Sequence, residues 1–485
     1  MAFNMSNRSQ SMILPDTIED YVATNAPVRV YDAFVDALNF SNLGISLAPN
    51  PHGGADEYYP KDLLKLLIYG TSYGIRSSRK LERACHDNLS FIWLMGGQKP
   101  DYRTIARFRI AHKAAIKKVL KECVRICLKL DLIEGNVLFI DGSKFRADAA
   151  INNTWTKERC EKYLKKIEER IDQLMNELVQ ADAQEEPDTS MVKIKEHIHD
   201  KEKLVNRIKG VMSNLETTGK ESINSTDPDC VKAKGRQGTH AIHNFQSTVD
   251  GKHGLIVHAE AVSQSNDYNQ LSVQVQNAVE TIGKNPQHVC ADAGYSDVGD
   301  IKTIDASINI VVPSHKQAQK ENDRCPVKPF DKEHFTYDSQ ADQYICPAGS
   351  RLVSIGFHDK DRSKKRYQAC GSTCQSCAHF GSPDSGKCTS SVNGRLINRL
   401  SDEELKEQLE ANYQKPENQT IYKLRKQTVE HPFGHIKRNL GAGQFLLRGT
   451  AKVNAEVSVL STCFNLARMI TILGIPCLLE KLTSW

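Results

Sequence analysis

Residues 136–143 read NVLFIDGS, and this stretch decides how the chain is divided. It is a short apolar run between Gly135 and the pair Asp141-Gly142. Such a run is typical of a buried strand, so we expect Asp141 where that strand ends, at the edge where α/β sheets bind ligands. The pattern before it is helical, and strand signals return after it. The sequence therefore predicts an α/β core behind an all-helical N-terminal domain.

The predicted N-terminal domain, residues 1–133, carries an excess of positive charge. From Pro60 the apolar side chains follow a helical spacing, as in Leu63, Leu64, Leu67 and Ile68. Between Lys61 and Lys129 there are sixteen Lys or Arg residues against five Asp or Glu residues. A set of short helices in which the last helix is basic suits DNA contact. The alternative is an all-helical packing domain with a solvated basic face. The candidate DNA-binding residues are Arg76, Arg79, Lys80, Arg103 and Arg107.

Residues 134–485 are predicted to form the core, with two insertions. In the first insertion, residues 154–216, apolar side chains recur at steps of three and four from Cys160 to Leu178 and again beyond the loop that follows. This pattern predicts an antiparallel helical hairpin with a structural role, and dimerisation or DNA spanning is the alternative. Strands are expected in residues 239–250, 254–262, 288–295 and 308–314.

The second insertion, residues 316–393, is polar and rich in cysteine. Two of its cysteines have the spacing C-x2-C, in which two thiolates can grip one tetrahedral zinc ion. The zinc candidates are Cys346, Cys374, Cys377 and Cys388. Cys370 competes for a ligand position, and we expect Cys325 to be a bystander. Unliganded thiols are the alternative to a structural zinc site.

Three acidic residues could share a site for divalent cations. Asp141 and Asp292 each follow an apolar strand pattern, whereas Glu430 lies in a helical pattern. Carboxylates from two strand ends and one helix suit Mg²⁺ or Mn²⁺, which prefer oxygen ligands. Taken singly, each residue is more often a cap or a solvated turn, so spacing alone does not decide the matter. His431 and His435 lack the His-Glu-x-x-His pattern of a metal helix, and we assign them no catalytic role.

Most of the chain resembles bacterial insertion-sequence transposases of the DDE type. The resemblance is carried by residues 58–109, by FIDGSKFRADA at 139–149 and by residues 234–262. It continues in ADAGYSD at 291–297, RKQTVEHPFGHIKR at 425–438 and residues 445–474. It implies an RNase H-like mixed-sheet core, in which Asp141, Asp292 and Glu430 are the catalytic, Mg²⁺-binding triad. It also implies double-stranded DNA as partner, both transposon ends and target, and a homodimer or higher oligomer.

The motif around the glutamate departs from the family pattern Tyr-x2-Arg-x3-Glu-x6-Lys. Lys437 keeps the spacing to Glu430, and Arg438 follows it. Lys426 occupies the place expected for the arginine, while Arg425 and Tyr422 lie one residue out of register. DNA contact is expected for Arg425, Lys426, Lys437 and Arg438.

The predicted activity is binding of terminal inverted repeats, followed by metal-dependent strand cleavage and strand transfer. The alternatives are a decayed or domesticated DNA-binding protein and a metal-dependent nuclease that does not join strands. A signal-peptide pattern is lacking, and the apolar run from Val457 to Leu479 is interrupted by Asn465 and Arg468. We therefore expect a buried helix there, no membrane partner, and a protein of the bacterial cytoplasm associated with the nucleoid.

Overall fold

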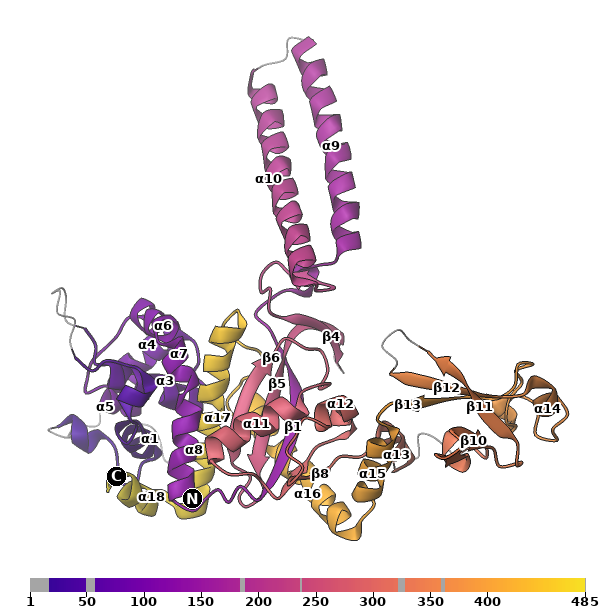
Figure 1. Cartoon of the computed structure of the whole chain (residues 1–485). Coiled ribbons are helices and arrows are strands. Elements are labelled where there is room, and N and C mark those ends of the chain that lie inside the picture. Colours follow the sequence, from indigo (N-terminus) through magenta and orange to yellow (C-terminus); the bar gives the residue numbers. More distant parts are fainter. Residues whose placement is uncertain are drawn as a thin grey trace, which may run out of the picture. The chain divides into compact units, whose positions relative to one another are not determined.

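A computed structural model describes residues 17–48, 57–183, 188–235, 238–321, 328–358 and 363–484 (Figure 1). The chain divides into two compact units. The first comprises Met1–Asp267, Asn277–Pro286 and Gln427–Trp485, and the second comprises Tyr268–Gln276 and Gln287–Lys426. The predicted boundary between residues 133 and 134 falls inside the first unit and stays a prediction.

The N-terminal part of the first unit is helical, as predicted. Its helices are α1 (Pro27–Asp36), α2 (Phe40–Leu43), α3 (Pro60–Ser72), α4 (Ser78–Asp87), α5 (Leu89–Leu94), α6 (Tyr102–Ala111), α7 (Lys113–Lys117) and α8 (Val119–Lys129). The four apolar side chains predicted to form one stripe of α3 are all buried. Helix α6 ends at His112, where the backbone leaves helical geometry and the His112 ring packs on Phe108.

The strands of the first unit pair mainly in antiparallel fashion. They are β1 (Val137–Arg146), β4 (Val231–Gly235), β5 (Gly238–Asp250) and β6 (Ile256–Val262). Strand β5 pairs with β1 along one edge and with β4 and β6 along the other. The predicted strand pair at 239–250 and 254–262 is confirmed by β5 and β6.

Strand β1 does not end at Asp141, so that part of the prediction is wrong. Asp141 pairs with Ser247, and the ladder continues to Arg146. The reason is Phe145, which is fully buried and packs against Phe245 at 4.9 Å and Phe445 at 5.4 Å between ring centroids. Burial of this aromatic ring is favourable, and it stabilises the part of the strand that follows Asp141.

The apolar C-terminal run forms α17 (Thr450–Leu473) and α18 (Ile475–Thr483). Among the described residues, α17 alone is long and apolar enough to pass a test for a membrane span, but most of its apolar window is buried in the protein. Its Asn465 side chain accepts a hydrogen bond from the Ile256 N–H and donates one to the Ile256 carbonyl, both at 2.8 Å. Asn454 bonds Ala261 in the same two-way manner. The helix therefore packs on β6, as a buried core helix.

The predicted helical hairpin is confirmed. It consists of α9 (Lys157–Ala183) and α10 (Asp188–Thr218), which lie side by side in Figure 1. Cys160 and Ile167 near the start of α9 pack with Ile208 and Leu215 near the end of α10, so the two helices are antiparallel. A short ribbon of β2 (Thr154–Trp155) and β3 (Ile223–Asn224) closes the base of the hairpin.

The second unit contains two sheet elements. Strands β7 (His288–Cys290) and β8 (Asn309–Val311) pair in parallel, at two positions where strands were predicted. A separate antiparallel sheet has the order β13-β12-β11-β10-β9. Its strands are β9 (Thr336–Asp338), β10 (Gln343–Ile345), β11 (Arg351–Phe357), β12 (Lys364–Ala369) and β13 (Leu396–Leu400). It occupies most of the cysteine-rich insertion, where no strands were predicted.

The helices of the second unit are α12 (Val298–Ile301), α13 (His315–Glu321), α14 (Gly371–Gln375) and α15 (Glu403–Tyr413). Two further helices, α11 (Leu271–Ile282) and α16 (Pro416–Arg438), contribute residues to both units. The fold is thus a mixed α/β architecture with a helical N-terminal region, and the RNase H-like arrangement of its core stays a proposal.

Candidate active site

Asp141 lies on β1 with Ser143 and Phe145 on the same side of the strand. Side chains alternate across a strand, so residues 141, 143 and 145 share one face of the sheet. The Asp141 carboxylate accepts a hydrogen bond from the Gly142 N–H at 3.0 Å. Because Phe145 is on the same face as Asp141, the residues that pack on Phe145 lie on the Asp141 side of the sheet.

Helix α16 packs on that face. Phe433 contacts the rings of Phe145 and Phe245, with centroid distances of 6.3 and 5.5 Å. Lys437, one turn further along, donates a hydrogen bond from Nζ to Ser143 Oγ at 2.6 Å and lies 4.6 Å from the centre of the Phe145 ring. The helix therefore carries Lys437 to the same side of β1 as Asp141.

Glu430 belongs to the same stripe of α16. Residues three and seven positions apart lie on one side of a helix, so Glu430 shares its side with Phe433 and Lys437. The Glu430 side chain is exposed, whereas Phe433 is buried. Glu430 thus lies on the helix that packs on the sheet face of Asp141.

Burial and the charge of Asp141 have opposite effects on the pKa of Lys437. Burial lowers the pKa of Lys437, while the negative charge of Asp141 raises it. The ammonium group is therefore held close to a candidate catalytic carboxylate without the full hydration that an exposed lysine has. Ser143, its hydrogen-bond partner, was not singled out in the sequence, where only its position two residues after Asp141 could have indicated a role.

The residue after Asp141 has to be glycine. A Cβ atom built at Gly142 would lie 2.1 Å from Oδ1 of Asp267. That carboxylate oxygen accepts hydrogen bonds from the side-chain amides of Asn244 at 2.8 Å and Gln246 at 2.6 Å. Asp267 therefore needs the space above Gly142, on the face of β1 opposite to Asp141. The sequence offered no signal for Asp267.

Asp292 lies in the second unit, directly after β7. It caps a short 3₁₀ helix, Ala293–Tyr295, and its carboxylate accepts the Gly294 N–H at 2.8 Å. Its other oxygen lies 3.9 Å from the Arg425 guanidinium, which also lies over the Tyr422 ring at 5.8 Å. Arg425 and Tyr422, which lie one position out of register in the family motif, therefore contact each other. Arg425 is also an ion-pair partner of Asp292.

No group of three or more His, Cys, Asp or Glu side chains in the described ranges is arranged as a set of metal ligands. His431 and His435 pack against the Phe464 ring, each at 5.5 Å, and burial lowers the pKa of both. Both histidines therefore pack against one aromatic ring of α17.

Four of the five basic candidates in the N-terminal helices are exposed. They are Arg79 and Lys80 on α4, and Arg103 and Arg107 on α6. The Tyr102 ring lies between two of them, 5.0 Å from the Arg79 guanidinium and 5.7 Å from that of Arg103. Together with Arg83, which is also exposed, these four residues form what we call the α4/α6 basic face.

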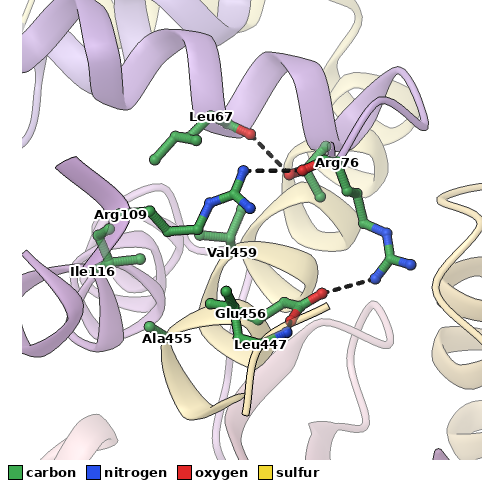
Figure 2. Close-up of a pocket in the computed structure, with 9 residues that line it drawn as sticks. Leu67, Arg76, Arg109, Ile116, Leu447, Ala455, Glu456 and Val459 are labelled. Carbon is green, nitrogen blue, oxygen red and sulfur yellow. Dashed lines mark hydrogen bonds and ion pairs between the residues drawn. The ribbon is translucent and has the colours of Figure 1, made fainter. Parts of the chain in front are cut away.

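The fifth candidate, Arg76, is engaged inside the protein. Figure 2 shows its guanidinium against Glu456, an ion pair of 2.8 Å. Arg76 also donates to the carbonyls of Gly441 and Gln444, and its own carbonyl accepts from Arg109. These contacts satisfy the guanidinium within the first unit, so the DNA-binding role predicted for Arg76 receives no support from its surroundings.

Two family models match the chain. The first, a transposase domain (DUF772), matches residues 16–111, and the second, a transposase DDE domain, matches residues 345–470. The chain therefore has the domains of a transposase. Together the matches support an insertion-sequence transposase of the DDE type, which confirms the family inferred from the sequence. No curated protein and no solved structure was matched.

The predicted site residues are distributed unevenly over these matches. The α4/α6 basic face lies within the first match, and Glu430 and Lys437 lie within the second. Asp141 and Asp292 lie between the two matches, so their assignment rests on the resemblance of the surrounding motifs and on the geometry described above.

Proposed function

We propose that this transposase binds the terminal inverted repeats of its own insertion sequence and catalyses metal-dependent cleavage and transfer of DNA strands. Asp141, Asp292 and Glu430 form the catalytic triad of an RNase H-like core. The observation that supports the proposal is the packing of α16, the helix that carries Glu430, on β1, where Lys437 bonds Ser143 two residues after Asp141.

The donor set fits Mg²⁺ or Mn²⁺ better than a softer metal. The three proposed ligands are carboxylates, and hard divalent cations prefer oxygen ligands and retain positions for water and phosphate. Such an ion, when bound, lowers the pKa of water and stabilises a leaving oxygen at phosphorus. The same carboxylates would serve hydrolysis of a strand and attack by a DNA 3′-hydroxyl.

The neighbouring cations have separate tasks. Arg425 holds the Asp292 carboxylate in orientation, because it is the ion-pair partner of that group. Lys437 places a positive charge beside Asp141, where it can contact a phosphate of the bound strand. The exposed Lys426 and Arg438 provide further phosphate contacts. The α4/α6 basic face binds DNA through its backbone phosphates, since cations gain binding energy by releasing counterions.

The protein is proposed to act as a homodimer or a higher oligomer. Two transposon ends have to be cut and joined together, so two active sites are needed in one complex. This statement rests on the proposed reaction.

The test uses a duplex that carries the inverted repeats flanking the gene, with Mg²⁺ present. Asp141→Asn, Asp292→Asn and Glu430→Gln should each lower the yield of both nicked and joined products by at least about a hundredfold. Each substitution removes a proposed carboxylate ligand of the metal ion. The matched control is Glu417→Gln, an exposed acid in the first turn of the same helix α16, which should retain activity. Binding of the duplex should persist in all four variants.

The alternative functions give different results in the same assay. Nicked products without joined ones from the unaltered protein would indicate a nuclease. Binding without either product would indicate a decayed or domesticated DNA-binding protein. Full activity in any one triad variant would overturn the assignment of that residue.

A further inference from the structure

Four cysteines from three segments line one cavity beside the five-stranded sheet of the second unit. They are Cys346, Cys374, Cys377 and Cys388. Three of them pack on the sheet's buried core, which includes Tyr344, Leu352 and Tyr367. All four are free thiols and only partly exposed. The exposed Cys370 does not line the cavity.

The turn after β10 is shaped to present the Cys346 sulfur. Gly349 has a φ of +80°, a conformation that favours glycine, and its N–H donates to the Cys346 carbonyl at 2.8 Å. This turn directs the Ser350 N–H to the Cys346 Sγ at 3.2 Å. Backbone donors of this kind stabilise a thiolate and fix its orientation, as partners outside the ligand set do at metal sites.

A second turn presents the C-x2-C pair in a similar manner. The Cys377 N–H donates to the Cys374 carbonyl at 3.1 Å, and the His379 N–H lies 3.5 Å from the Cys377 Sγ. The Cys388 N–H then donates to the His379 carbonyl at 2.8 Å, which ties the fourth cysteine to the same turn. Backbone hydrogen bonds therefore hold three of the four cysteines in one local framework.

We propose that Cys346, Cys374, Cys377 and Cys388 bind one structural zinc ion. Soft sulfur ligands in a set of four select zinc in closed tetrahedral sites, which leave no open position for catalysis. Among the described residues these thiols are not arranged as a set of metal ligands, so zinc binding has to draw them together around the cavity. The ion would join the turn after β10 to the segment that links β12 and β13. This site is independent of the proposed DNA chemistry.

The test is the metal content of the full-length protein, purified from cells without added chelator. We expect about one zinc ion per chain. Cys374→Ser and Cys388→Ser should lose the zinc, whereas Cys370→Ser should retain it. Cys370 is a matched control, because it lies four residues before Cys374 but is exposed and hydrogen-bonds Ser372 instead. Zinc retained in both cavity variants, or absent from the unaltered protein, overturns the proposal.

A second measurement uses the unaltered protein, so that it does not depend on whether the cysteine variants fold. In the unaltered protein, four thiols should become reactive toward a thiol reagent only when zinc is removed, and mass spectrometry should map them to the four cavity cysteines. Disulfide bonds among these cysteines in the freshly purified protein would overturn the proposal. DNA cleavage by the proposed triad is measured separately, so the two proposals can fail independently.

Discussion

Arg76 and Glu456 form an ion pair of 2.8 Å in the first unit, with side chains that are only 11% and 10% exposed. The Glu456 carboxylate also accepts hydrogen bonds from the N–H groups of Leu446 and Leu447. Burial raises the pKa of Glu456, and the charge of Arg76 lowers it. One pair therefore joins the loop between α3 and α4 to α17 and to the loop that precedes α17 (Figure 2).

Removal of Arg76 should destabilise the first unit strongly. Arg76→Met leaves a buried carboxylate without its cation, a change that costs about 3–5 kcal/mol in comparable pairs. Thermal unfolding should show a clear drop in Tm, and Arg79→Met, at an exposed position, should show little change. The drop should shrink as the pH is lowered, because an acid whose pKa is raised on folding gains a proton and with it relative stability.

A double variant separates the ion pair from simple packing. Arg76→Met combined with Glu456→Met should be more stable than Arg76→Met alone, because the carboxylate that lost its ion-pair partner is also removed. If the double variant loses stability additively, the pair does not act as described.

Replacement of Lys437 should impair catalysis more than folding. Lys437→Met keeps the apolar stem against Phe145 but removes the ammonium group beside Asp141 and its bond to Ser143. We expect strand cleavage to fall by about a hundredfold through misplacement of the strand, with Tm nearly unchanged. Lys423→Met, at an exposed position of the same helix to which no DNA contact is assigned, is the control. Equal losses in the two variants would contradict a positioning role for Lys437.

The α4/α6 basic face should set the salt dependence of DNA binding. Arg103→Gln with Arg107→Gln should reduce the slope of log K against log salt concentration by roughly one for each phosphate contact removed. Lys165→Gln with Lys166→Gln on α9 changes the net charge equally at exposed positions and should leave the slope unchanged. The measurement is a salt titration of binding to the transposon-end duplex. An unchanged slope in the first variant would remove this face from the DNA interface.

The five-stranded sheet should lose stability between about pH 4 and pH 2. Hydrogen bonds from Lys365 and Tyr367 lower the pKa of Asp342 to about 2, from its ordinary value of 3.8. An acid whose pKa is lowered on folding stabilises the fold above its unfolded pKa, and that contribution disappears as the pH falls through the folded value. Hydrogen exchange of β10 to β12 should therefore accelerate in this window.

Asp342→Asn is the informative variant for this effect. Asp342 has a φ of +46°, a conformation that asparagine also tolerates, so the turn between β9 and β10 should survive the substitution. The variant should exchange faster at neutral pH and show a weaker acid dependence. Asp384→Asn, which removes a highly exposed partner of Lys328, should change neither. Acid dependence that persists in full in Asp342→Asn would rule out this carboxylate as its source.

Long periodic segments were predictable from the sequence, because their apolar spacing reports burial directly. The hairpin of α9 and α10 and the stripe on α3 are examples. The end of β1 was not predictable, because Gly142 reads as a turn signal when the chain alone is considered. In the folded protein this glycine makes room for the Asp267 carboxylate, a contact across more than a hundred residues.

The strands of the cysteine-rich insertion were missed for a related reason. Strands β9 and β10 are three residues long and contain polar side chains, so they carry no periodic signal of their own. Their stability comes from the contact of Tyr337, Tyr344 and Tyr367 around one core. For the candidate site, motifs named the residues whose roles are proposed. The partners Ser143 and Glu456 could not be named in this way, because tertiary packing alone brings them to Lys437 and Arg76.

The two asparagines of α17 occupy the backbone groups of β6 that a neighbouring strand would otherwise use. Asn454 and Asn465 each bond both the N–H and the carbonyl of one β6 residue. A strand with unpaired backbone groups is a template for pairing with another chain. By bonding these groups with side-chain amides, the helix leaves them unavailable to an incoming strand, so the sheet cannot grow through them at this edge.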